Sequence, residues 1–136
     1  MKNNEKGILF EKQVKELFER EYDVKLEAEY PLEIGFKSLK SHKFDFGNSK
    51  ILLECKDYSW TSGNNIPSAK ICHLKEVMLY FHLAPKNYKK ILILNRNIRG
   101  INGESVGEYF IRLNKAFIPE DVEIFEIENE NIEKIY

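Results

Sequence analysis

The feature that most constrains the fold of this chain is a short segment in which Asp45 is followed, after eight residues, by Glu54-Cys55-Lys56. Gly47-Asn48-Ser49 lies inside this segment and is typical of a turn, and apolar residues flank it on both sides. The pattern predicts two adjacent strands joined by a tight turn. Because strand side chains alternate between faces, Glu54 and Lys56 are expected on one face, where Asp45 can meet them.

Two carboxylates and an ammonium on one face of a sheet are an unfavourable arrangement unless a further group joins them. A hard divalent cation such as Mg²⁺ would do so, since it prefers oxygen ligands. We therefore interpret Asp45 and Glu54 as metal ligands and Lys56 as a group that orients or helps to deprotonate a water. In the alternative interpretation, Asp45 belongs to the turn, and Glu54 and Lys56 are ordinary exposed strand residues.

The Asp-x8-Glu-x-Lys motif across a hairpin resembles the core of the PD-(D/E)XK nuclease superfamily, which includes restriction endonucleases, Holliday-junction resolvases and DNA-repair nucleases. The resemblance extends over roughly residues 7–96, although Phe44 replaces the proline that many members have before the Asp. It implies an endonuclease that cleaves DNA with Mg²⁺, for which Mn²⁺ can substitute. It also implies that the backbone carbonyl of Cys55 binds the metal, while we expect the Cys55 side chain to be a small buried apolar group.

Glu11 is the fourth candidate for the catalytic and metal-binding set. It borders the apolar stripe of a helix expected over residues 4–21, close to Val14 and Phe18. The segment Gly7 to Glu11 resembles the first helix of resolvases, where such a glutamate contributes to the metal site. Glu11 is otherwise an ordinary glutamate of a helix surface.

Basic and aromatic side chains around the motif form the candidate DNA-binding surface. The lysines and arginines would contact phosphates, and the aromatic rings would stack on bases. The candidates are Lys37, Lys40, His42, Lys43, Trp60, Lys70, Arg96 and Arg99, with Tyr58 and His73 as further candidates. Lys70 is alternatively a surface residue of a first helical turn, and Trp60 a residue that packs in a loop.

The charge of the chain is unevenly distributed. The net charge is −1, but residues 119–136 alone carry −6, so the remainder carries +5. A moderately basic body permits DNA binding. We interpret residues 119–136 as an acidic C-terminal strand and a solvated tail.

The hydrophobic pattern predicts a single α/β domain over residues 1–136. After the first helix we expect a strand over 24–36, the two motif strands, a helix over 67–83 that starts with Pro67, and a buried strand over 90–95. A capping box at Ser105–Glu108 starts a further helix, and a last strand covers 122–127. The resemblance implies a restriction endonuclease-like three-layer core, in which helices flank a mixed β-sheet in the order α-β-β-β-α-β. The last helix and strand extend that core.

The sequence lacks the signals that mark several classes of protein. We find no apolar run of about 20 residues and no signal-peptide pattern, so we expect a cytoplasmic protein without a membrane partner. Two cysteines are too few for a disulfide scaffold or a zinc site. The resemblance implies DNA as partner and a homodimer or a subunit of a larger nuclease system. The alternatives are a non-catalytic nucleic-acid or protein-interaction module that retains the fold, and an unrelated α/β domain.

Overall fold

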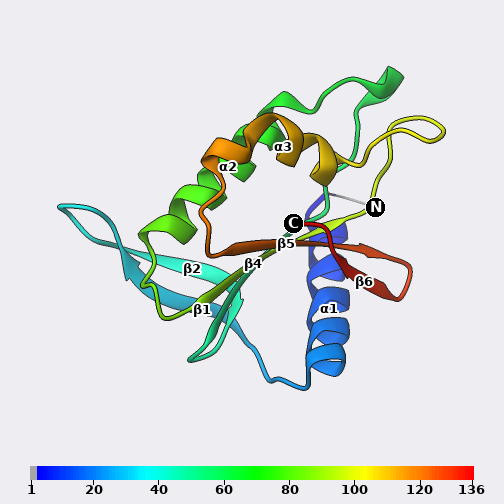
Figure 1. The fold of residues 1–136 in the computed structure, drawn as a ribbon. Helices are drawn as coiled ribbons and strands as arrows, with labels where there is room; N and C mark the ends of the chain where they lie inside the picture. Colours follow the sequence, from blue (N-terminus) through cyan, green and yellow to red (C-terminus); the bar gives the residue numbers. More distant parts are fainter. Residues whose placement is uncertain (1–2) are drawn as a thin grey trace.

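A six-stranded mixed β-sheet runs through the computed structural model, which describes residues 3–136 (Figure 1). The strands are β1 (Glu27–Ile34), β2 (Lys40–Gly47), β3 (Ile51–Lys56), β4 (Lys89–Asn95), β5 (Val122–Glu128) and β6 (Asn131–Lys134). They are adjacent in chain order, and β3, β4 and β5 are parallel, whereas the other neighbours are antiparallel. Met1 and Lys2, which the expected domain includes, lie outside the described residues.

The three α-helices of residues 3–136 cover both faces of the sheet. They are α1 (Asn3–Tyr22), α2 (Ser68–Leu83) and α3 (Val106–Asn114). Helix α1 lies on one face, and α2 and α3 lie on the other (Figure 1). Helix α2 connects the parallel strands β3 and β4, and α3 connects β4 and β5, as expected for helices that cross between parallel strands. The expected α/β class, with a mixed sheet flanked by helices, is confirmed.

Two apolar cores result, one on each face. Leu52 and Leu92 face α2 and α3, where they pack with Phe81. Leu53 and Ile93 face the opposite way and pack against α1. Strands β3 and β4 are therefore buried on both faces, which explains the continuous apolar run predicted for β4.

Several element boundaries differ from the sequence expectations. Strand β1 begins at Glu27 rather than at residue 24. Pro67 is the residue before α2 and not its first residue, because its ψ of 74° is not helical. The capping box is confirmed: the Ser105 hydroxyl accepts the Glu108 N–H at 3.0 Å, and a Glu108 carboxylate oxygen accepts the Ser105 N–H at 2.8 Å.

The C-terminal segment is largely exposed, as expected, but it is ordered as a strand rather than a tail. Residues 131–134 pair with β5 as strand β6. The Lys90 ammonium lies 2.7 Å from Asp121 Oδ2, and the Lys89 ammonium lies 2.9 Å from Glu123 Oε1. Cations of β4 therefore offset part of the acidic charge that the sequence concentrates in this segment. Among residues 3–136, no helix has both the length and the apolar content needed to cross a membrane.

A side-chain-stabilised turn joins β2 to β3. Asn48 Oδ1 accepts the backbone N–H groups of Lys50 and Ile51 at 2.8 and 2.9 Å. At the end of β2, the Tyr30 ring packs on Gly47, where any Cβ would come within 2.7 Å of the ring. This close approach requires glycine and fixes the end of the hairpin.

Candidate functional site

The candidate site forms where strands β2 and β3 separate. Their Cα pairing is limited to two positions, Phe46 with Leu53 and Gly47 with Leu52. Beyond them, Asp45 Oδ2 accepts the backbone N–H of Cys55 at 2.9 Å. The Asp45 carboxylate thus replaces a ladder hydrogen bond, which holds it at the diverging edges of the two strands.

Strand β2 changes face at Asp45. Phe44 is buried in the core next to α2, whereas Phe46 is buried in the core next to α1, although simple alternation would place both on one face. Glu29, which stands opposite Asp45 in β1, has a φ of +52°, so the neighbouring strand is also irregular here. Asp45 consequently lies between the two faces of the sheet and is near groups on both.

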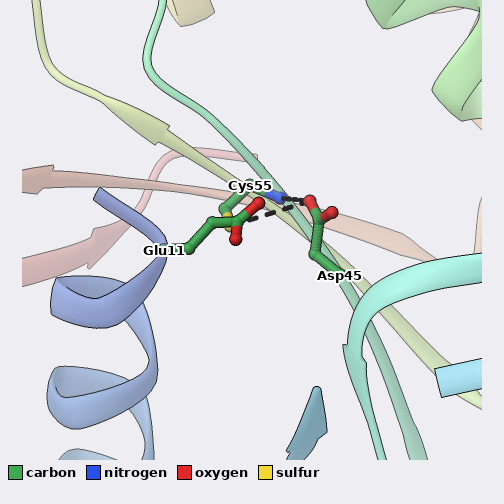
Figure 2. Close-up of side chains that lie close together, drawn as sticks. All are labelled: Glu11, Asp45 and Cys55. Carbon is green, nitrogen blue, oxygen red and sulfur yellow. Dashed lines mark hydrogen bonds between the residues drawn. The ribbon is translucent and has the colours of Figure 1, made fainter. Parts of the chain in front are cut away.

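On the α1 side, Asp45 is grouped with Glu11 and Cys55 (Figure 2). One ligand atom from each of the three residues lies within 4.8 Å of the other two. Cys55 Sγ lies 3.7 Å from Asp45 Oδ2. The Cys55 side chain is buried as expected, but the expectation that it is only an apolar group is wrong, because its thiol contacts the carboxylate.

On the α2 side, the Glu54 carboxyl group is held by a histidine. Glu54 is 3% exposed, and its Oε1 lies 3.0 Å from His42 Nε2. The His42 ring is stacked on Tyr80 of α2, with 4.1 Å between the ring centroids. The alternative that Glu54 is an exposed strand residue is therefore wrong.

The site disfavours the charged forms of two glutamates. Burial, followed by the charge of Asp45, raises the pKa of Glu54 to about 9 and also raises the pKa of Glu11. Burial disfavours the charged form of Lys56, but Asp45 and Glu54 outweigh it, so its pKa is raised. A bound cation would favour the charged forms of both glutamates.

Two hollows lie next to Lys56, which lines both. One has a volume of about 300 Å³ and is lined by α1 and the end of β3, with Glu11, Lys56, Tyr58 and Lys70 in its wall. The other has a volume of about 130 Å³ and is lined by Glu54, Lys56, His42, His73 and Tyr80. Lys70 also places its ammonium 5.4 Å from the centre of the Tyr58 ring. The structure therefore brings Lys70, Tyr58, His42 and His73 to the motif residues.

Three other candidates form contacts elsewhere. Arg96 Nη1 lies 2.8 Å from Glu126 Oε1, and its guanidinium also approaches two further carboxylates. The Arg99 guanidinium lies 4.7 Å from the centre of the Trp60 ring. Trp60 donates both its backbone N–H and its indole N–H to Asn97. These side chains hold loops together and connect them to β5.

The remaining lysines lie on the hairpin formed by β1 and β2. Lys37, Lys40 and Lys43 are all exposed, and the Lys40 ammonium lies 5.3 Å from the centre of the Tyr80 ring. Tyr80 itself was not predicted from the sequence, because its apolar neighbours in the helix pattern suggested only packing. Its hydrogen bond to Glu76, four residues earlier, follows a spacing that the sequence does contain.

Two donors of the group formed by Glu11, Asp45 and Cys55 suit a hard divalent cation. The carboxylate oxygens of Glu11 and Asp45 are ligands that Mg²⁺ prefers, whereas a thiol is a ligand for softer metals. We therefore assign no ligand role to the Cys55 sulfur. The Glu54 carboxyl group, on the α2 side, does not belong to this group. Comparison of this chain with family models, curated proteins and solved structures found no match.

Proposed function

We propose that this protein is a Mg²⁺-dependent nuclease of the PD-(D/E)XK type, with a restriction endonuclease-like fold, that hydrolyses phosphodiester bonds of DNA. One observation carries the proposal: Asp45 is held between β2 and β3, beside Glu11 and Glu54, with Lys56 on the same strand as Glu54. The element order α1-β1-β2-β3-α2-β4 supports it, because it is the order of the family core.

The proposed metal ligands are Asp45, Glu54 and Glu11, together with the backbone carbonyl of Cys55, which is added from the resemblance. A bound Mg²⁺ would neutralise charge at the scissile phosphate and lower the pKa of a coordinated water. The three carboxylates come from β2, β3 and α1. Each element therefore contributes one oxygen ligand to the proposed centre.

Lys56 is proposed to orient the attacking water and to stabilise the charge on the phosphate oxygens. Asp45 and Glu54 raise the pKa of its ammonium, so Lys56 is charged at neutral pH. A charged ammonium stabilises developing negative charge and donates hydrogen bonds, but it cannot accept a proton. The raised pKa thus favours the electrostatic role over that of a general base.

DNA is the proposed substrate because exposed lysines lie beside the site and along the hairpin that extends from it. Lys37, Lys40 and Lys43 lie on the β1–β2 hairpin, and Lys70 lines the hollow next to Glu11. One site cleaves one strand, so a double-strand cut needs two copies, either in a homodimer or within a larger nuclease system. Arg96, Arg99 and Trp60 stay candidates for DNA contacts, although each would have to exchange an internal contact for one with DNA.

The proposal is tested by a cleavage assay in Mg²⁺, in Mn²⁺ and in EDTA. The substrates are duplex DNA, single-stranded DNA, a four-way junction and RNA. We expect metal-dependent cleavage of DNA by the wild type and its loss in Lys56→Met and Asp45→Asn. Lys75→Met is the matched control, because Lys75 is an exposed lysine of α2 that lines a separate hollow near Phe117.

Two results would contradict the proposal. Equal cleavage by Lys56→Met and the wild type would show that the activity does not come from this site. Failure of the wild type to cleave any substrate would favour the alternative of a non-catalytic module that retains the fold.

A further inference from the structure

The β1–β2 hairpin extends away from the helices (Figure 1). Two large apolar side chains, Phe36 and Leu39, are exposed at its tip. Phe36 is 74% exposed and Leu39 is 64% exposed. Gly35 has a φ of +152°, and a Cβ at this position would lie 2.0 Å from the Ser38 carbonyl oxygen. The tip is therefore a tightly built turn that holds two large apolar side chains in solvent.

Positive charge predominates around the apolar tip. Lys37 lies between Phe36 and Leu39, and Lys40 and Lys43 follow on β2, where both are exposed. Residues 33–43 contain these three lysines and one acid, the exposed Glu33, which pairs with Ser41. This surface therefore favours a partner that carries negative charge around an apolar contact.

Tip-to-tip pairing of two copies of this chain does not meet these requirements. Stable protein interfaces bury about 1,200–2,000 Å² in total, which two side chains at a hairpin tip do not supply. Two such tips would also bring three lysines of one copy against three of the other. Nucleic acid meets both requirements, negative charge and an apolar contact, because its phosphates surround stacked apolar base faces.

We infer that Phe36 and Leu39 form a wedge that enters the base stack of DNA, while Lys37, Lys40 and Lys43 bind the flanking phosphates. The inference rests on the proposed function, from which it takes DNA as substrate. Phenylalanine and leucine are among the side chains that proteins insert between base steps. Because insertion requires unstacking, the preferred ligand is a duplex whose stack is already interrupted by a nick or a branch.

Strand β2 links the tip directly to the metal centre. Leu39, the wedge residue next to β2, lies six residues before Asp45, which corresponds to about 20 Å of extended chain. At 3.4 Å per base step, this distance is about six base pairs of duplex. The wedge is therefore expected to enter the DNA about six base pairs or more from the scissile phosphate.

The test measures DNA binding in EDTA, so that it does not depend on cleavage. The probe is a nicked duplex with 2-aminopurine at the nick, compared with the same duplex without the nick. We expect the wild type to raise the 2-aminopurine fluorescence and to bind the nicked duplex more tightly. The double variant Phe36→Ala/Leu39→Ala should lose the fluorescence change and bind about 5–100-fold more weakly.

Two controls accompany the double variant. Ile101→Ala removes another apolar side chain, 91% exposed, from a different loop and should leave binding unchanged. Lys37→Ala and Lys40→Ala should each lower the slope of log K against log salt concentration by about 0.9. Circular dichroism melts of all variants should match the wild type, because the substituted side chains are exposed.

Equal affinity and an equal fluorescence change in the double variant would overturn the inference. A change in the oligomeric state of the double variant, measured by light scattering, without a change in its DNA binding would also overturn the inference. The tip would then contact protein rather than DNA. If the tip variant binds DNA weakly but the wild type cleaves no substrate, the wedge is supported and the proposed nuclease activity is contradicted. If the wild type cleaves DNA but the tip variant binds DNA as tightly as the wild type, the nuclease activity is supported and the wedge is contradicted.

Discussion

Glu54 shows at the scale of a single residue how the fold shapes the proposed metal site. Its carboxyl group is 3% exposed, and burial and the charge of Asp45 raise its pKa to about 9. In the metal-free protein Glu54 therefore keeps its proton at neutral pH. Metal binding would have to displace that proton, so metal affinity is coupled to pH.

This raised pKa predicts how the stability of the metal-free protein depends on pH. Glu54 loses its proton near its ordinary pKa of 4.5 in the unfolded chain, but only near 9 in the folded protein. Between these values the folded state binds more protons, so the free energy of unfolding falls as pH rises. We expect a loss of more than about 1.4 kcal/mol, the equivalent of one pKa unit, in urea unfolding from pH 5 to 9 in EDTA. Glu54→Gln should flatten this dependence, and an identical slope in both proteins would contradict the prediction.

His42 is predicted to position Glu54. Its Nε2 lies 3.0 Å from Glu54 Oε1, and Tyr80 stacks against its ring. Groups that orient a metal ligand typically affect metal affinity or activity by about 10–100-fold when removed. We expect His42→Ala to raise the Mg²⁺ concentration needed for half-maximal cleavage by this factor. His42→Gln should recover part of the lost Mg²⁺ affinity. Tyr80→Phe is the control, since it keeps the ring under His42; an unchanged Mg²⁺ titration in His42→Ala would exclude the positioning role.

The placement of the candidate residues was predictable from the sequence where the residues are close along the chain. The spacing of Asp45, Glu54 and Lys56 placed them in one hairpin, because strand alternation and turn composition are local signals. The contact between His42 and Glu54 was not predictable, because it depends on the separation of β2 and β3 beyond Phe46. The change of face at Asp45 likewise contradicts simple alternation.

At the scale of elements, Arg96 connects the end of β4 to β5 and α3. Its guanidinium contacts Glu126, whose side chain is 2% exposed, and Glu108, which also belongs to the capping box of α3. Gly107 permits this packing, because a Cβ there would lie 2.8 Å from Glu126 Oε2. The group is thus a structural junction between three elements.

Removal of Arg96 is predicted to be strongly destabilising. Arg96→Ala leaves Glu126 buried without its cation, which typically costs about 3–5 kcal/mol. Urea unfolding would measure this loss. Arg112→Ala is the matched control, because Arg112 pairs with Glu104 at the surface and its loss should cost at most about 1 kcal/mol. Equal stability of the two variants would mean that Arg96 is not a structural anchor and is free to contact phosphate.

Strand β4 should be the least tolerant element. Ile93 is fully buried between the sheet and α1, as the apolar run predicted. Ile93→Ala should lower the free energy of unfolding by about 2–5 kcal/mol through the cavity that it creates. A nearly neutral effect in denaturant unfolding would contradict the central position of β4.

Strand β6 was not predicted from the sequence, because short and exposed edge strands carry little hydrophobic pattern. Residues 131–134 are a short, mostly exposed edge strand, so no apolar alternation marks them. Their pairing with β5 depends on a turn at Asn129, which has a positive φ of 56°. The central strands were predictable because both of their faces are buried.

At the scale of the whole molecule, the candidate centre joins the two layers of helices. Glu11 approaches from α1, whereas His42 and Glu54 contact Tyr80 and the hollow beside α2. A cation bound to Glu11, Asp45 and Glu54 would therefore connect a helix to two strands. Its binding should stabilise the entire domain.

Mg²⁺ is accordingly predicted to raise the thermal stability of the wild type. At a concentration of one hundred times Kd, the gain is about 2.7 kcal/mol. Differential scanning calorimetry with increasing Mg²⁺ would measure it, and Asp45→Asn should abolish the increase. Glu11→Gln should reduce the increase if α1 supplies a ligand, and an unaltered response in this variant would remove Glu11 from the metal set.

The turn between β2 and β3 gives the chain a place where its length can change during evolution. Ser49 and Lys50 are exposed, and the two paired positions of the hairpin lie between this turn and Asp45. Residues inserted at the turn would lengthen the interval between Asp45 and Glu54 without moving either carboxylate. Descendants of this chain can therefore lose the eight-residue spacing and keep the same centre, and a foreign peptide can be displayed at Ser49–Lys50 beside an intact site.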